Sequence, residues 1–162
     1  MSDILSIIEQ NSGTAVSSTS ALGLRGEQLA LKYLIDRGYR IVVTNFKVPV
    51  GRNSKGVQVT GEIDIIALDG ETLCFVEVKT RRSEEFAPVI TAVDRRKQRQ
   101  ISRTARIYRR IFNIFDNPHR FDVVTVLAQK HVDPVIELNK GYWTDAVFSR
   151  KTWASYSGYT DY

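Results

Sequence analysis

The sequence predicts an α/β domain in which helices flank a central mixed β-sheet. Two long segments carry apolar residues at helical spacing, shorter segments are rich in β-branched and aromatic residues, and the order along the chain is α-β-β-β-α-β-β. The 162 residues, 43% of them hydrophobic, suit one packed domain. We expect this domain over residues 21–148, between a flexible N-terminal segment (1–20) and a polar C-terminal tail (149–162).

The first helix is expected over Leu22–Arg37, where leucine and isoleucine recur at helical spacing and Gly38 follows as a stop signal. Tyr39–Phe46 is rich in β-branched and aromatic residues and predicts a strand. The next segment, Lys47–Thr60, combines glycine, proline and asparagine with basic residues. This composition favours a flexible basic loop or the tip of a hairpin.

The middle of the chain predicts a β-hairpin followed by a second long helix. The hairpin strands are Gly61–Leu68 and Thr72–Thr80, joined around Asp69-Gly70, a dipeptide typical of tight hairpin turns. Helical spacing returns over Val93–Phe112. The two remaining strands are expected at Phe121–Ala128 and, shorter, at Val135–Leu138.

Composition argues against membrane and secreted proteins. No apolar stretch approaches the ~20 residues that span a bilayer, and Met1–Gln10 lacks the basic start of a secretory signal. The single cysteine, Cys74, cannot form an internal disulfide and is expected to be a small buried apolar side chain. We therefore expect a soluble protein of the reducing cytoplasm with no membrane partner.

Charged residues interrupt the two hairpin strands. Side chains alternate between the two faces of a strand, so Glu62 shares a face with Asp64, and Glu77 shares one with Lys79. The expected turn pairs Glu62 with Glu77 and makes Asp64 and Glu77 diagonal neighbours on one face, with Cβ atoms ~7–8 Å apart. A turn one residue longer would put them on opposite faces. The alternative is a salt-bridged hairpin face exposed to solvent.

Two carboxylates beside a lysine fit the hydrolysis of a phosphodiester bond. Mg²⁺, for which Mn²⁺ is expected to substitute, takes oxygen ligands from one or two carboxylates plus phosphate and water, and it lowers the pKa of a bound water. We predict Asp64 and Glu77 as metal ligands and Lys79 as a catalytic residue that stabilises negative charge or orients the water. Glu27 and Gln98, near the inner sides of the two helices, are further catalytic candidates; the alternatives are a boundary side chain and an exposed helix start.

Basic residues concentrate between Arg81 and Arg110, where ten lysines and arginines stand against three acids. Four of the arginines recur at helical spacing on the outer side of the second helix, and such a row can follow a phosphate backbone without reading bases. A solvated helix face is the alternative. The residues predicted to bind nucleic acid are Arg81, Arg82, Arg95, Lys97, Arg99, Arg106 and Arg110.

The strand order Asp64, then Glu77-Val78-Lys79, resembles the PD-(D/E)xK motif of restriction-endonuclease-like enzymes. A longer set of residues resembles the YraN family over roughly residues 22–128. This set comprises Gly26-Glu27, Ala30, Gly38-Tyr39, Asn45, Gly61-Glu62-Ile63-Asp64, Phe75 to Arg81, Lys97-Gln98 and Arg120 to Val124. The segment Lys47–Thr60 is longer than the usual connection in that family.

The resemblance implies a restriction-endonuclease-like core similar to archaeal Holliday junction resolvases. It implies metal ligation by Asp64 and Glu77, catalysis by Lys79, and auxiliary roles for Glu27 and Gln98. It also implies a role near the site for Arg120 or Asp122, for which an ion pair at a strand end is the alternative. The expected function is a metal-dependent endonuclease acting on DNA, including branched or damaged DNA, and the resolvase resemblance suggests a homodimer. A non-catalytic nucleic-acid-binding module and an adaptor protein are the competing hypotheses.

Overall fold

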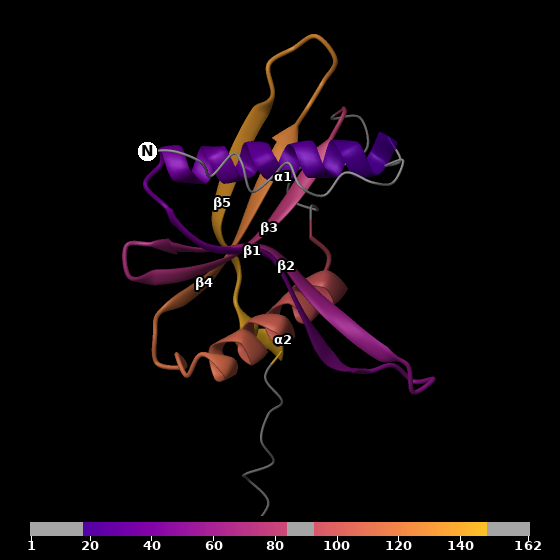
Figure 1. Cartoon of the computed structure of the whole chain (residues 1–162), viewed down its shortest axis with the longest axis vertical. Coiled ribbons are helices and arrows are strands. Elements are labelled where there is room, and N and C mark those ends of the chain that lie inside the picture. Colours follow the sequence, from indigo (N-terminus) through magenta and orange to yellow (C-terminus); the bar gives the residue numbers. More distant parts are fainter. Residues whose placement is uncertain (1–17, 84–92, 149–162) are drawn as a thin grey trace, which may run out of the picture.

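The computed structural model describes residues 18–83 and 93–148, which form a five-stranded sheet with two long helices (Figure 1). The predicted α/β class with a mixed sheet is confirmed. α1 begins at Ser18, inside the segment expected to be flexible, and the rest of both predicted terminal segments lies outside the described residues. The elements are α1 (Ser18–Asp36), β1 (Arg40–Arg52), β2 (Gln58–Asp69), β3 (Thr72–Arg81), α2 (Arg95–Ile111), β4 (His119–Leu127), β5 (Val135–Trp143) and the 3₁₀ turn η3 (Asp145–Phe148).

The strands lie in sequence order, β1-β2-β3-β4-β5. Neighbours are antiparallel except β3 and β4, which are parallel. A parallel pair needs a long crossover, and α2 supplies it here. The crossover carries α2 to the β1–β2 side of the sheet, because its contacts are mainly with those two strands, whereas α1 contacts mainly β3 and β4.

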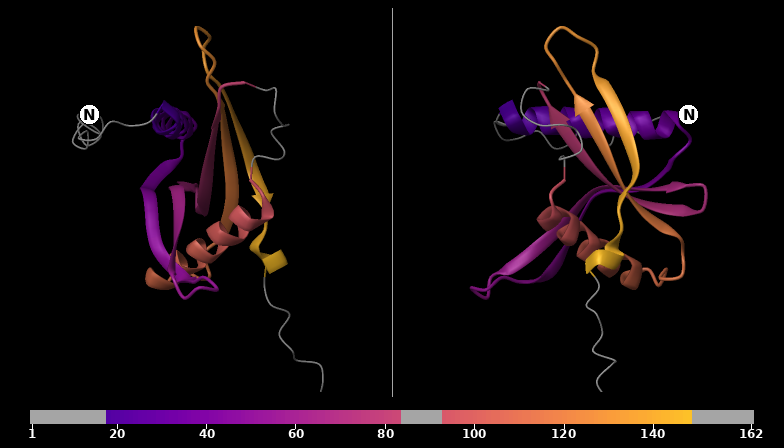
Figure 2. Two further views of the ribbon diagram at one scale, coloured as in Figure 1. Left: turned by 90° about the vertical axis from the view of Figure 1, so that its right-hand side faces the viewer. Right: turned by 180° about the vertical axis from the view of Figure 1, so that it is seen from behind.

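The two helices cover different apolar clusters of the sheet. Ala30 and Leu34 of α1 pack on residues from β2, β3 and β4, while Ile101, Ala105 and Tyr108 of α2 pack on a second cluster that includes aromatic residues of β3, β4 and β5. Figure 2 shows α1 beside β3, β4 and β5, with α2 farther along the sheet. The sheet therefore has a buried core on each face, one under each helix.

Two glycines allow the helices to approach the sheet closely. A Cβ on Gly26 of α1 would lie 1.7 Å from Thr80 Oγ1 of β3, and a Cβ on Gly61 of β2 would lie 2.0 Å from Thr104 Oγ1 of α2. Real side chains cannot approach so closely. The missing side chains at these two positions bring α1 to the end of β3 and α2 onto β2.

The structure of Lys47–Thr60 shows that the prediction of a flexible basic loop is wrong and that the alternative, a hairpin tip, is right. The segment is not a flexible loop, since β1 continues to Arg52 and β2 starts at Gln58, so that only the residues between them form a hairpin tip. Pro49 lies in β1, the edge strand, where the absence of an N–H is tolerated, and the β1–β2 register shifts directly after it. β5 also extends beyond the predicted Val135–Leu138 and ends on the buried Trp143.

The turn between β2 and β3 lies one residue later than predicted. Asp69 pairs with Thr72, which leaves Gly70 and Glu71 as the two turn residues, with Gly70 at φ 60° in the first of these positions. Asp69 stays in the strand because its Oδ2 accepts hydrogen bonds from Arg120 (2.7 Å) and Lys140 (2.9 Å). These two tertiary contacts stabilise Asp69 at the end of β2.

Cys74 is buried, as predicted, and burial raises the pKa of its thiol to about 12. Neither helix in the described part of the chain has the length and apolarity that crossing a bilayer requires.

Candidate functional site

The shifted turn moves Glu77 toward Asp64 along the hairpin. The β2–β3 ladder runs from Asp69 paired with Thr72 to Ile65 paired with Val76, and Asp64 and Glu77 are the next residues of the two strands beyond this last pair. The predicted diagonal arrangement, with Glu62 opposite Glu77, is therefore wrong. The predicted turn and the observed turn both have two residues. The pairing of β2 with β3 is therefore shifted by two residues, and the paired side chains stay on the faces that were predicted for them next to the turn.

β2 changes its side-chain alternation at Asp64. Ile63 and Ile66 both contact the apolar cluster under α2, whereas Ile65 contacts the cluster under α1. Asn45 of β1 lies across from this position, between the pairs that flank it, and has a left-handed φ of 53°. Because of this irregularity, the prediction that Glu62 and Asp64 share a face is wrong. Asp64 lies between the two helices instead. The carboxylate Oδ2 of Asp64 accepts a hydrogen bond from the Val78 N–H at 2.7 Å.

Glu77 is the buried centre of the site. Its side chain is 2% exposed, and its Oε1 lies 2.9 Å from Lys79 Nζ and 3.2 Å from Lys97 Nζ. Its Oε2 is buried and has no hydrogen-bond partner among the described residues. A buried carboxylate oxygen without a partner is rare in folded proteins and is costly unless a water, ion or ligand satisfies it.

The other two carboxylates of the site are also poorly solvated. Burial, followed by the negative charge of Glu77, raises the pKa of Asp64 to about 7. Burial also raises the pKa of Glu27, with a further contribution from Glu62, while a hydrogen bond with Asn45 opposes the rise. Glu27, Asn45 and Asp64 line one small cavity of about 120 Å³ between α1 and the sheet. Negative charge is therefore crowded at this point.

We define the carboxylate site as Glu27, Asp64, Glu77, Lys79 and Lys97, which come from α1, β2, β3 and α2. Among the described residues, no group of three or more His, Cys, Asp or Glu side chains could hold a metal ion. Asp64 and Glu77 nevertheless fit a hard cation that takes its remaining ligands from water and phosphate. The unpartnered Oε2 of Glu77 and the raised pKa of Asp64 are features that a bound cation would relieve.

Lys97 and Gln98 are neighbours in sequence but have different surroundings. Lys97, predicted as a nucleic-acid-binding residue, contacts Glu77 in the carboxylate site. The Gln98 amide instead donates to the Val93 carbonyl at 2.9 Å, and the side chain lines a surface hollow with Asn139 and other β5 residues. The structure therefore does not bring Gln98 to the carboxylate site. The contact with Glu77 could not be predicted from the sequence, because the reach of Lys97 to β3 depends on how α2 packs on the sheet.

The exposed side of α2 is almost entirely basic. All its exposed residues except Ile111 are arginines, and we call them the α2 arginine face. The side chains of Arg95, Arg106 and Arg110 form no ion pair or hydrogen bond with a described residue, while the Arg99 guanidinium lies 5.6 Å from the centroid of the Phe148 ring. Arg81 and Arg82 lie at and just after the end of β3. The α2 arginine face comprises Arg95, Arg96, Arg99, Arg103, Arg106 and Arg110.

Arg120 and Asp122 form an ion-pair network away from the carboxylate site. Arg120 Nε lies 2.8 Å from the fully buried Asp122, and its guanidinium also bonds Asp69 and the Tyr39 hydroxyl. Asp122 pairs in register with Val76, whose side chain is on the α1 side, while Glu77 faces α2. This arrangement matches the strand-end ion pair rather than a role beside the carboxylates.

Comparison with known proteins shows the family of the chain. Residues 26–126 match the model of the uncharacterised protein family UPF0102. The UPF0102 protein of Geotalea uraniireducens is 43% identical over 121 residues, covering 75% of this chain and 87% of its own length. That of Chlorobium limicola is 44% identical over 108 residues, covering 67% and 76%. The chain therefore belongs to the UPF0102 family, and the resemblance to YraN proteins is confirmed at that level.

Among solved structures, the chain is similar to the crystal structure of SSO0001, with a TM-score of 0.37 and 15% sequence identity. That similarity covers 81% of this chain and 55% of the other.

Proposed function

We propose that this UPF0102 protein is a metal-dependent nuclease that hydrolyses phosphodiester bonds of DNA at the carboxylate site. The observation that carries the proposal is the unpartnered, buried Oε2 of Glu77 beside a second, desolvated carboxylate and two lysines. A structural ion cluster has its charges balanced and its oxygens bonded. Here the Glu77 Oε2 has no partner among the described residues. An exposed carboxylate would have a lower free-energy cost than this buried one.

Asp64 and Glu77 would hold the cation, Mg²⁺ or Mn²⁺, and the restriction-endonuclease-like assignment of the core rests on the same pair. When bound, the cation supplies Lewis-acid polarisation of a phosphate oxygen and lowers the pKa of a water. The Val78 N–H fixes the orientation of the Asp64 carboxylate through its 2.7 Å hydrogen bond. Glu77 is fixed by burial and by its two lysine contacts. Both carboxylates are thus held in place before any substrate arrives.

Lys79 is the candidate catalytic residue of the chain. Its ammonium lies 2.9 Å from Glu77 Oε1 and its side chain is 34% exposed, so it contacts the carboxylate while still reaching the surface. An ammonium in this position can donate to a phosphate oxygen as negative charge develops there. Lys97 approaches the same oxygen from α2 and would play a positioning role. Glu27, across the small cavity, is placed to accept a proton from a water.

The α2 arginine face would bind the nucleic acid beside this site. Its six arginines lie on one exposed side of a single helix, so the guanidinium groups other than that of Arg103, which donates to the Val50 carbonyl at 2.8 Å, can contact successive phosphates. Contacts of this kind give affinity that falls steeply with salt and carry little sequence information. DNA without strong sequence preference is therefore the proposed substrate class, and branched DNA is included in it.

Cleavage of labelled single-stranded, duplex and four-way-junction DNA in Mg²⁺ or Mn²⁺ tests this proposal. We expect EDTA, Glu77→Gln and Lys79→Ala each to lower the cleavage rate at least ~100-fold, the scale of a single lost electrostatic group. Glu71→Gln is the matched control, because it makes the same chemical change at an exposed turn residue of the same hairpin. Cleavage that persists in Glu77→Gln would refute the assignment.

A non-catalytic nucleic-acid-binding module is the second candidate. It is favoured by the two lysine contacts of Glu77, which already compensate its charge without a metal. This reading expects salt-sensitive DNA binding with no cleavage of any substrate in either cation. Binding unaffected by Mg²⁺ and by Glu77→Gln would then decide for it.

A further inference from the structure

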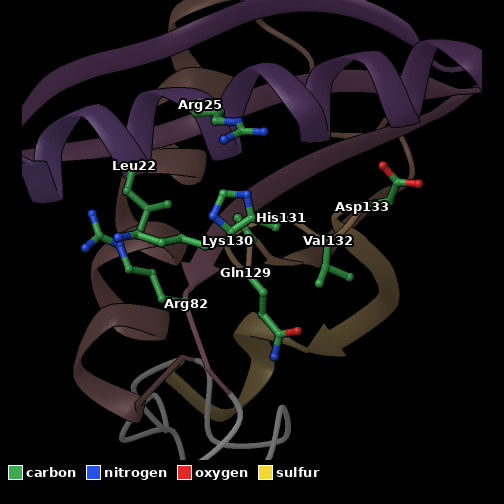
Figure 3. Close-up of a pocket in the computed structure, with 9 residues that line it drawn as sticks. Leu22, Arg25, Arg82, Gln129, Lys130, His131, Val132 and Asp133 are labelled. Atoms are coloured by element: carbon green, nitrogen blue, oxygen red, sulfur yellow. The ribbon is translucent and has the colours of Figure 1, made fainter.

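A second basic surface lies at the other side of α1 from the small carboxylate cavity. It is a pocket of about 1090 Å³ bounded by α1, the end of β3 and the β4–β5 connection (Figure 3). Four of its lining residues carry basic side chains: Arg25, Arg82, Lys130 and His131. We call this the basic pocket. Its acidic lining residue, Asp133, lies at the opposite end of the view from Arg82 and Lys130.

Three of the four basic side chains of the pocket have no ion pair within the part of the chain that the structure describes. Arg25, Lys130 and His131 are exposed, and none of them forms an ion pair with another described residue. In contrast, Lys32 on the same helix is paired with Asp36 at 2.6 Å. Three unpaired cationic or protonatable side chains around one hollow are suited to binding an anion that bears several charges.

The fold builds this pocket from three separate segments. Gly26 lets α1 touch Thr80, which places Arg25 beside the end of β3. The Ala128 N–H donates to the Arg81 carbonyl at 2.8 Å, so the chain leaves β4 next to β3 and passes directly to Lys130 and His131. The pocket thus lies at the carboxyl ends of the one parallel pair, β3 and β4, the position where open α/β sheets bind ligands.

The basic pocket and the carboxylate site are connected through β3, which carries Lys79 and ends next to Arg82. Arg82 follows Lys79 by three residues, which corresponds to about 10 Å along an extended chain. One DNA strand advances about 3.4 Å per nucleotide along the helix axis, so this span corresponds to about three nucleotides. The pocket volume, slightly above the ~300–1,000 Å³ of small-molecule sites, has room for a stretch of backbone rather than one ion.

We propose that the basic pocket binds backbone phosphates of a nucleic acid, as a second anchoring site distinct from the α2 arginine face. This inference rests on nucleic acid being the substrate of the proposed function, but not on cleavage. Arg25 and Lys130 contribute fixed positive charges from opposite sides of the pocket, and Arg82 connects it with the lysine end of β3. The pocket would hold the strand a few nucleotides from the scissile bond.

Binding of a fluorescein-labelled 20-nucleotide single strand and its duplex, measured at several salt concentrations in EDTA, tests the proposal without any cleavage. We expect Arg25→Ala with Lys130→Ala to lower the slope of log affinity against log salt by about 2, since each phosphate contact contributes about 1. The matched control, Lys32→Ala in α1 with Arg40→Ala at the start of β1, removes two positive charges outside the pocket and should leave the slope unchanged. Thermal unfolding of both double variants verifies that these exposed substitutions preserve the fold.

An unchanged slope in the Arg25 and Lys130 double variant would overturn the proposal. Inorganic phosphate and a mononucleotide, added as competitors, distinguish the source of the phosphate. Displacement of the labelled strand only by other polynucleotides supports a backbone-binding pocket. Displacement of the labelled strand by a mononucleotide at micromolar concentration would overturn the proposal in favour of a nucleotide site. Failure of the nuclease assay leaves the slope result intact, so the two proposals fail separately.

Discussion

Asp64→Asn provides the sharpest test of the carboxylate site. Asparagine keeps the shape of the side chain and an oxygen that can accept the Val78 N–H, but it removes the negative charge. Burial and the charge of Glu77 raise the pKa of Asp64 from about 3.8 to about 7 in the folded protein. We therefore expect the variant to be more stable than the wild type in the absence of a metal, and the gain to depend on pH.

The sign and size of this stability difference follow from the linkage between proton binding by Asp64 and folding. Between the two pKa values the folded wild type binds more protons than the unfolded chain, so its stability falls as pH rises through this range. A difference of about 3 pH units corresponds to about 4 kcal/mol at full ionisation. We expect the variant to be more stable by about 2 kcal/mol at pH 5 and by up to about 4 kcal/mol at pH 8, and by almost nothing near pH 3.

Urea unfolding of both proteins from pH 5 to pH 8 in EDTA measures this difference directly. Added Mg²⁺ at 100 times its Kd should then narrow the difference at pH 8, because it stabilises the wild type by about 2.7 kcal/mol and does not stabilise the variant. A difference that does not change with pH, or a variant that is less stable at pH 8 in EDTA, would refute the reasoning on desolvation. Equal stabilisation of both proteins by Mg²⁺ would refute metal binding at Asp64.

Three further outcomes are expected. Gly26→Ala should destabilise the protein by about 1–3 kcal/mol in urea unfolding, because the new Cβ meets Thr80, whereas Gly23→Ala, with open space around it in the same helix, should be neutral or stabilising by up to ~1 kcal/mol. Asp122→Asn should cost about 3 kcal/mol by the same measurement, since Arg120 loses a buried charge partner, while DNA affinity stays unchanged. Removing two arginines from the α2 arginine face should lower the salt slope of DNA binding by about 2.

Much of the fold could be predicted from local patterns. The helix around Leu34 and the valine-rich strand β4 follow from apolar spacing that depends only on neighbours in the chain. The hairpin carrying Asp64 and Glu77 could be predicted too, because charged residues in an otherwise apolar pair of strands stand out without any knowledge of packing. Side-chain parity from Ile65 to Asp69 survived the error in the turn, since a shift of two residues changes partners but not faces, whereas the change of alternation at Asp64 was not predicted.

The tertiary structure decided what these residues contact. Asp69 at the end of β2 is stabilised by Arg120 across 51 residues of sequence, and the contact of Lys97 with Glu77 depends on where the α2 crossover packs. Sequence alone determined which charges the chain carries and on which elements they lie. Only folding determined which of them are buried, paired or left without a partner, because burial and long-range contacts, not local pattern, set the free energy of a charge in a protein.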